Sequence, residues 1–85
     1  MIIISHRGNI DGPEPKKENH PDYIDFALAQ GFDVEVDVWW IQGIFLGHDG
    51  PEYTISKEWL LDRKDHLWVH CKNLEAAHHL AKEFR

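Results

Sequence analysis

Cysteine and long apolar runs are the scarcest features of this 85-residue chain. Its single cysteine, Cys71, allows no internal disulfide and no zinc-finger cysteine pair, so a reducing compartment is the simplest expectation. No stretch approaches the roughly 20 apolar residues of a membrane span. The start, Met-Ile-Ile-Ile-Ser, has neither the basic region nor the apolar length of a signal peptide. We therefore expect a cytoplasmic protein without a membrane span.

Positive charge is also in short supply. The chain has 9 Lys and Arg against 15 Asp and Glu, which gives a formal net charge of -6. Sequence-independent binding of nucleic acid requires a positive surface, so a nucleic-acid partner is not expected. An acidic protein can still bind a phosphorylated molecule if a divalent cation reverses the local charge.

Aromatic surface, in contrast, is abundant for so short a chain. Four tryptophans are a large apolar load for one small core. Some of this surface is expected to contact something outside the chain, with Trp39, Trp40, Trp59 and Trp68 as the candidates.

Periodicity predicts strands that alternate with helices in one domain over residues 1–85. Ile2 to Ser5 is expected to form a strand buried on both faces, and a helix should run from Pro21 to Gln30, with Asn19 or His20 near its cap and Gly31 closing it. Residues 32–40 alternate strictly and give the clearest strand. A hairpin-like turn and return strand to Leu46, a helix capped by Ser56, a strand from Leu67 to Lys72 and a final helix capped by Asn73 follow. In that last helix, the residues expected to face inward are Leu74, Ala77, Leu80, Ala81 and Phe84.

This order predicts an α/β fold with right-handed crossovers, which place the C-terminal ends of the three parallel strands on one rim. His6, Asp37 and Lys72 follow or end those strands. The chain holds about three βα units, whereas an eight-stranded barrel needs at least some 200 residues. We therefore expect either a fragment of a TIM-type barrel or a chain completed by oligomerisation or a partner.

Acidic side chains are concentrated on one face of the clearest strand. Asp33, Glu35 and Asp37 alternate with valines, and three like charges on one face repel unless water or a cation separates them. A solvated outer face is one interpretation. The other is that Glu35 and Asp37 offer two hard oxygen donors that suit Mg²⁺ or Ca²⁺.

Two histidines lie on turns that follow strands. His6 precedes Arg7-Gly8, and His48 lies within Gly47-His48-Asp49-Gly50. Two imidazoles so placed can act as general acid and base on opposite sides of a phosphorus atom.

The spaced set of these residues resembles the glycerophosphodiester phosphodiesterase family. The motifs that carry the resemblance are His6-Arg7-Gly8, Glu18-Asn19, Ala27, Gly31-x-Asp33-x-Glu35-x-Asp37-Val38 and Gly47-His48-Asp49. They cover about the first half of the chain and extend to Lys72. The resemblance implies a TIM-type barrel, His6 and His48 as the acid/base pair, Glu35 and Asp37 as metal ligands, and Arg7 as a phosphate contact. Sphingomyelinase D-like enzymes and phosphatidylinositol-specific phospholipases C share that architecture, so the resemblance leaves the substrate open.

His70 departs from the family pattern, which has an acidic metal ligand two residues before a lysine, here Lys72. An imidazole there is a softer donor and favours Mn²⁺ or Zn²⁺ if it is a ligand. Alternatively, His70 contacts substrate, supports another ligand or is an ordinary strand histidine. Lys72 is a candidate for holding a phosphate oxygen or is simply solvated.

Other polar residues are expected to be structural. Glu18 and Asn19 should fix the loop before the first helix, His20, His78 and His79 should lie on the surface, and Cys71 should face the core.

The sequence thus predicts a metal-dependent phosphodiester hydrolase that acts on glycerophosphodiester-like or phospholipid-like substrates. The alternative is a non-catalytic metal- or phosphate-binding module, or a self-assembling barrel fragment. Both hypotheses place the function at the same residues.

Overall fold

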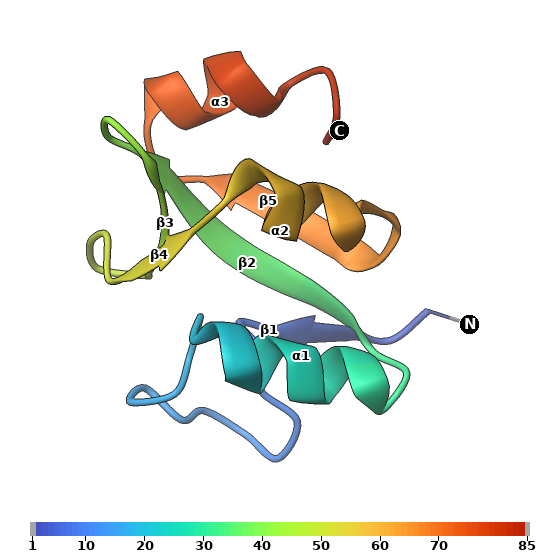
Figure 1. The fold of residues 1–85 in the computed structure, drawn as a ribbon. Coiled ribbons are helices and arrows are strands. Elements are labelled where there is room, and N and C mark those ends of the chain that lie inside the picture. Colours follow the sequence, from blue (N-terminus) through green and yellow to red (C-terminus); the bar gives the residue numbers. More distant parts are fainter. Residues whose placement is uncertain (1, 85) are drawn as a thin grey trace.

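The computed structural model describes residues 2–84 and is built around one long strand, β2 (Figure 1). The strands are β1 (Ile4–His6), β2 (Asp33–Trp40), β3 (Ile44–Leu46), β4 (Tyr53–Ile55) and β5 (Leu67–Cys71). The helices are α1 (Pro21–Ala29), α2 (Lys57–Asp62) and α3 (Leu74–Leu80), with a short 3-10 turn, η1, at Lys64–His66. The chain is therefore a mixed α/β fold with a five-stranded sheet and three helices.

β2 pairs with three strands because two of them share one of its edges. β1 and β5 run parallel to β2, whereas β3 is antiparallel to β2 and β4 is antiparallel to β3. The carbonyl of Glu35 accepts from the Arg7 N–H at 2.7 Å and that of Asp37 from the Gly47 N–H at 3.1 Å. Alternate residues of a strand direct their backbone groups to the same edge. β1 and β3 thus follow one another along one edge of β2, while β5 occupies the other.

The three helices are capped by residues that the sequence analysis proposed as caps. The His20 ring, the Ser56 hydroxyl and the Asn73 side chain accept from the first turns of α1, α2 and α3. The predicted helix from Pro21 ends at Ala29, one residue early, and Gly31 follows it with φ +95°, a conformation that favours glycine.

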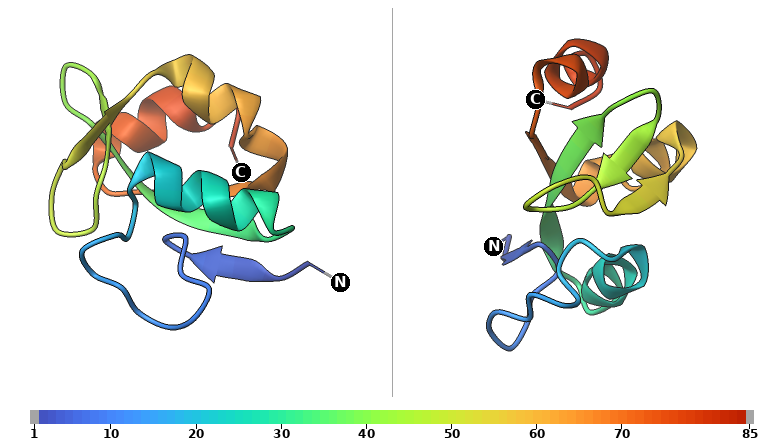
Figure 2. Two further views of the ribbon diagram at one scale, coloured as in Figure 1. Left: turned by 60° about the horizontal axis from the view of Figure 1, so that its bottom comes forward. Right: turned by 90° about the vertical axis from the view of Figure 1, so that its left-hand side faces the viewer.

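The core lies on one side of the sheet. Val34, Val36 and Val38 of β2 are fully buried and form one cluster with Ile24 of α1, Leu60 of α2 and other apolar residues that include Leu80 of α3. Seen along the sheet, α1 and α2 lie on the same side of it (Figure 2). The predicted alternation of β2 is confirmed, and Cys71, in register with Val38, is half-buried, so its thiol pKa is raised by burial.

The face of α3 that packs inward differs from the prediction. Ala76 and Leu80 are buried, whereas Leu74 is 84% exposed and Ala77 and Ala81 are exposed. Leu74 directly follows the Asn73 cap, and the helix rotates from there so that its third and seventh residues face the sheet. The prediction was right for Leu80, and Phe84 is partly buried.

The first strand also differs from the prediction. Pairing begins at Ile4, and Ile2, Ile3 and Ile4 are all exposed rather than buried on both faces. β1 has β2 as its only paired neighbour among the described residues, so no strand pairs with its other edge there. The short strand β4 was not predicted, because the isolated sequence Tyr-Thr-Ile is too short to show a period.

Each tryptophan has a partner within the chain. Trp39 Nε1 donates to the Gly47 carbonyl, Trp40 stacks on His79, Trp59 lies under the Arg63 guanidinium, and Trp68 Nε1 donates to Asp33. Only Trp68, at 45%, counts among the strongly exposed apolar side chains. The tryptophans are thus used mainly for local packing, and an outside contact stays a prediction for Trp68.

None of the helices in residues 2–84 is long and apolar enough to cross a lipid bilayer.

Candidate active site

The predicted acidic face of β2 lies opposite the core. Asp33, Glu35 and Asp37 alternate with the buried valines. The parallel register sets His6 of β1 beside Glu35, and Trp68 and His70 of β5 beside Glu35 and Asp37. The face that carries the predicted site residues is therefore shared by all three parallel strands.

Asp37 is the most buried charged side chain of this face, at 1% exposure. Its Oδ2 accepts from Asn19 Nδ2 at 2.9 Å and its Oδ1 lies 3.0 Å from His70 Nδ1. The Arg7 Nε and His48 Nδ1 atoms lie 3.2 and 3.4 Å from Oδ2. One carboxylate thus gathers side chains from four separate segments, three of which sequence analysis had proposed for the site.

Asn19 is the contributor that the sequence did not reveal. Its Nδ2 atom donates to the Asp37 carboxylate, and its Oδ1 atom accepts from the Asp37 backbone N–H at 2.9 Å. The Asn19 amide therefore makes two hydrogen bonds to Asp37. Asn19 is fully buried and has φ +66°, a conformation that Asn tolerates better than most residues. Its place in the Glu18-Asn19 motif was the only signal, and that motif suggested a loop role.

The loop before α1 is held by a second buried carboxylate, Glu18, as predicted. Glu18 accepts from Arg7 Nη1 at 2.9 Å, from Asn9 Nδ2 at 3.0 Å and from the Glu14 backbone N–H at 3.2 Å. Arg7, with φ +57°, lies between Glu18 and Asp37. Its guanidinium is thereby fixed at the rim of the sheet, where a phosphate contact was predicted.

His6 ends β1 and contacts the other predicted metal ligand. Its Nε2 atom lies 2.6 Å from Glu35 Oε1, and both side chains are partly open to solvent. Because β1 and β2 are in register at these two residues, the contact follows directly from strand pairing.

His48 is carried by a tight turn after β3. The Gly47 N–H donates to the Asp37 carbonyl, and the Gly47 carbonyl accepts from Trp39 Nε1. Both backbone groups of the residue before His48 are therefore hydrogen-bonded to β2. The Nε2 atom of His48 lies 3.7 Å from the exposed Asp49 carboxylate. His6 and His48 therefore flank Glu35 and Asp37 from neighbouring ends of β1 and β3, as the sequence predicted.

Burial and donors act in opposite directions on the buried acids. Burial raises the pKa of Asp37, but hydrogen bonds from Asn19 and His70 and the charges of Arg7 and Lys72 outweigh it and hold the pKa below its usual value. For Glu18 too, burial is outweighed by its three donors, and the pKa is lowered. Both groups are thus carboxylates at neutral pH, able only to accept hydrogen bonds.

A hollow of about 440 Å³ adjoins this cluster. It is lined by Arg7, His48 and Glu18 together with Pro13, Pro15, Asp49 and Glu52. Arg7 and His48 are therefore reachable by a small molecule from the side of the loop before α1.

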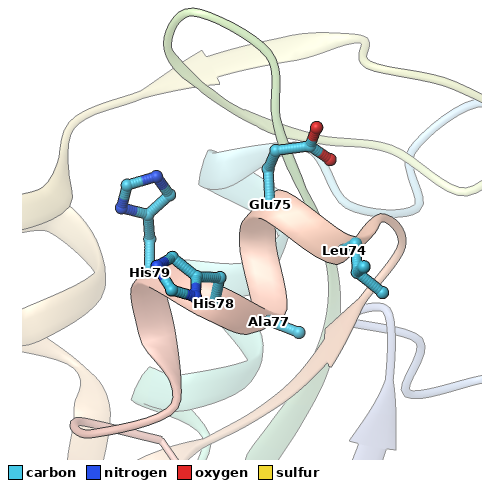
Figure 3. A pocket seen from close by; sticks show the side chains of 5 residues that line it. All are labelled: Leu74, Glu75, Ala77, His78 and His79. Atoms are coloured by element: carbon cyan, nitrogen blue, oxygen red, sulfur yellow. The ribbon is translucent and has the colours of Figure 1, made fainter.

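A second hollow has no relation to the predicted site. Its lining residues, Leu74, Glu75, Ala77, His78 and His79, all belong to α3 (Figure 3). His78 and His79 are exposed as predicted, with ring centroids 5.5 Å apart and His79 stacked on Trp40.

The predicted metal ligands meet only part of what a cation needs. Within residues 2–84 no three His, Cys, Asp or Glu side chains converge into a metal-binding set. Both oxygens of Asp37 already accept hydrogen bonds, and His70 faces Asp37 through Nδ1. Mg²⁺ nevertheless requires only one or two protein carboxylates, with water and substrate oxygens completing its shell. Glu35 and Asp37 as the two carboxylates of such an open site stay a prediction.

The fold and these contacts define a small α/β domain with a carboxylate and imidazole site at the rim of its parallel strands. No family model, no curated protein and no solved structure matches the chain.

Proposed function

We propose that the chain carries the acid/base half of a metal-dependent phosphodiester hydrolase site. The observation that supports this most strongly is the pairing of two solvent-accessible histidines with two carboxylates of one strand: His6 with Glu35 and His48 with Asp37. A carboxylate beside an imidazole orients the ring and stabilises its protonated form. Two such pairs, with the Arg7 guanidinium beside Asp37, match the needs of in-line displacement at phosphorus.

In this proposal His6 and His48 move protons. One imidazole takes the proton of the attacking hydroxyl and the other protonates the leaving oxygen. Arg7, fixed by Glu18 and Asp37, holds the non-bridging oxygens. Lys72, whose positive charge helps to lower the pKa of Asp37, assists in holding these oxygens. A cation held by Glu35 and Asp37 would polarise the phosphoryl group. Mg²⁺ and Ca²⁺ suit these oxygens best, and Mn²⁺ or Zn²⁺ would be favoured if His70 also binds the ion.

The substrate class stays a proposal as well. A glycerophosphodiester or a phospholipid-like diester is what the family resemblance implies, with water or a neighbouring substrate hydroxyl as the nucleophile. A TIM-type barrel as the wider architecture and a cytoplasmic location are likewise proposed.

A phosphate-binding module without catalysis is the second candidate, favoured by one observation. The Asp37 oxygens are contacted by donors from the protein itself, so hydrogen bonds within the chain hold the cluster together. Arg7, His48, His70 and Lys72 would then bind a phosphate group that is not turned over.

Turnover measurements on matched variants distinguish the two candidates. The protein is assayed with Mg²⁺, Mn²⁺ or Ca²⁺ on glycerophosphodiesters, lysophospholipids and a nitrophenyl diester. We expect His6→Ala and Glu35→Gln to lower kcat by about 10²- to 10⁴-fold, the range of general acid–base contributions. His78→Ala, on the exposed side of α3, should leave kcat unchanged.

The enzymatic proposal would be contradicted if the protein bound inorganic phosphate but turned over none of these substrates with any of the cations. Equal losses in all three variants would show that folding rather than chemistry had been changed.

A further inference from the structure

The Asp37 carboxylate contacts two imidazoles of the site, in each case at the Nδ1 atom of the ring. His70 Nδ1 lies 3.0 Å from Oδ1 and His48 Nδ1 lies 3.4 Å from Oδ2. The two histidines come from β5 and from the turn after β3, on opposite edges of β2. A single side chain at the centre of the sheet thus faces both.

The chemistry of this contact fixes which nitrogen of His70 carries hydrogen. The carboxylate of Asp37 accepts from Asn19 Nδ2 at Oδ2 and faces the guanidinium of Arg7, so it is the acceptor in its contacts. A 3.0 Å hydrogen bond between it and Nδ1 therefore requires an Nδ1–H on the ring. The Nε2 atom is left as the free, reactive position.

The same reasoning extends to His48. Its Nδ1 atom is buried and has no hydrogen-bond partner within residues 2–84, apart from the carboxylate oxygen of Asp37 that it faces at ion-pair distance. Contacts of this kind are often long before a ligand is bound. An Nδ1–H directed at Asp37 would satisfy the buried atom and leave Nε2 without a hydrogen bond, 3.7 Å from the exposed Asp49 carboxylate.

Exposure shows what the free atoms can reach. The Asp37 side chain is 2% exposed, whereas those of His48 and His70 are 42% and 59% exposed. Both rings therefore have a buried carboxylate behind them and solvent beyond them. Lys72 directly follows β5, and its backbone N–H donates to the carbonyl of Val38, the residue after Asp37.

We propose that Asp37 is a positioning residue for two imidazoles, and that His70 is a third substrate-facing histidine, next to His48. His70 binds a phosphoryl oxygen through Nε2–H in its doubly protonated form, in which Nδ1–H donates to Asp37. This rests on the proposed function, because it names additional roles within the same site. It gives His70 a role that differs from that of a cation ligand.

The chain contains a matched control at the other end of β2. His66 Nδ1 lies 3.0 Å from Asp33 Oδ1, the same atom pair at the same distance as in the contact between His70 and Asp37. Asp33 and His66 lie at the start of β2 and just before β5, away from the rim where His6 and His48 lie. Asp33→Asn therefore removes an equivalent carboxylate without touching the site.

Ring nitrogen spectra of the intact protein provide the test. Long-range proton–nitrogen correlations, recorded where the imidazoles are neutral, report which nitrogen carries hydrogen. We expect the Nδ1–H form for His48, His70 and His66. Asp37→Asn places an amide NH2 opposite one of the two rings. With the amide oxygen kept toward Asn19 Nδ2, that ring is His70, which should convert to the Nε2–H form, and kcat should fall by about 10- to 100-fold with little change in KM. Asp33→Asn should change His66 alone.

Inorganic phosphate is the probe for the substrate-facing role of His70. Adding it should shift the Nε2 and ring-proton signals of His48 and His70, and it should leave those of His66 in place. His70→Ala should weaken phosphate binding, and His70→Gln, which keeps a donor, should restore part of it.

The spectra of the unaltered protein decide the positioning role even if Asp37→Asn fails to fold. An Nε2–H form of His70 in the unaltered protein, or phosphate shifts equal at His66 and His70, would overturn the inference. Absence of turnover in the unaltered protein would instead overturn the proposed function, so the two failures are distinguishable.

Discussion

At the scale of the residue, Gly47 shows how tightly the backbone around His48 is arranged. A methyl group on its Cα would overlap the carbonyl oxygen of Gly50 and crowd the backbone N–H of Glu52. Both obstacles belong to the main chain and cannot rotate away. The turn that carries His48 therefore depends on the absence of a side chain at this position.

Gly47→Ala is accordingly expected to lower the free energy of unfolding by about 1–3 kcal/mol, the usual cost of overpacking. The displaced turn should also move His48 and reduce kcat. Gly50→Ala is the matched control, because a methyl there meets nothing within 4 Å, and its effect should stay within about 0.5 kcal/mol. Urea unfolding and initial rates measure both variants, and equal stability of the two would contradict the steric reading.

At the scale of the element, Asn73 does more than cap a helix. Its Oδ1 accepts from the Ala76 N–H of α3 and from the Trp40 N–H of β2, while its Nδ2 donates to the Trp40 carbonyl. The side chain therefore bonds the end of β2 beyond the last residue pair with β5, Val38 and Cys71. Ser56, by comparison, accepts only within the first turn of α2.

This difference predicts unequal costs for two cap substitutions. Ser56→Ala should lower the free energy of unfolding by about 1 kcal/mol, as a lost cap does. Asn73→Ala loses the cap and two further hydrogen bonds, each worth about 0.5–1.5 kcal/mol, and should be roughly twice as costly or more. Thermal and urea unfolding measure the pair; equal losses would mean that the contacts with Trp40 contribute nothing.

The elements themselves were largely predictable because their signals are local. The strict alternation of residues 32–40 and the caps at Ser56 and Asn73 are encoded within a few residues, and β2, α2 and α3 start within one residue of the prediction. The exposed Leu74 and the unpredicted β4 show the limit. Which helical face packs inward and whether a three-residue segment pairs depend on neighbours that are distant in sequence.

At the scale of the whole molecule, three carboxylates couple stability to pH. The pKa of Asp33 is lowered by hydrogen bonds from His66 and Trp68, and those of Glu18 and Asp37 are lowered despite their burial. In each case the unfolded chain binds protons at higher pH than the folded chain. The contribution to stability is therefore complete above the ordinary carboxyl range near pH 4 and is lost as the pH falls through the lower folded values.

We therefore expect the unfolding temperature to change little between about pH 7 and pH 5 on account of these groups and to fall below about pH 4. Asp33→Asn should make the acid limb shallower, because one of the three linked protons is removed. Unfolding followed by circular dichroism from pH 7 to pH 3 measures this. An acid limb that is flat in the unaltered protein would contradict the prediction.

The sequence by itself determined the alternating strand, the helix caps and the residue types of the site, because strand period, capping and the chemistry of His, Asp and Glu are properties of short segments. It also placed His6, Asp37 and Lys72 at the ends of parallel strands, which must share a rim. Only the tertiary structure decided that Asn19 makes two hydrogen bonds to Asp37 and that His70 contacts the same carboxylate. Those contacts join residues 18 and 33 positions apart, and such pairings arise from strand register and loop closure, which no local pattern records.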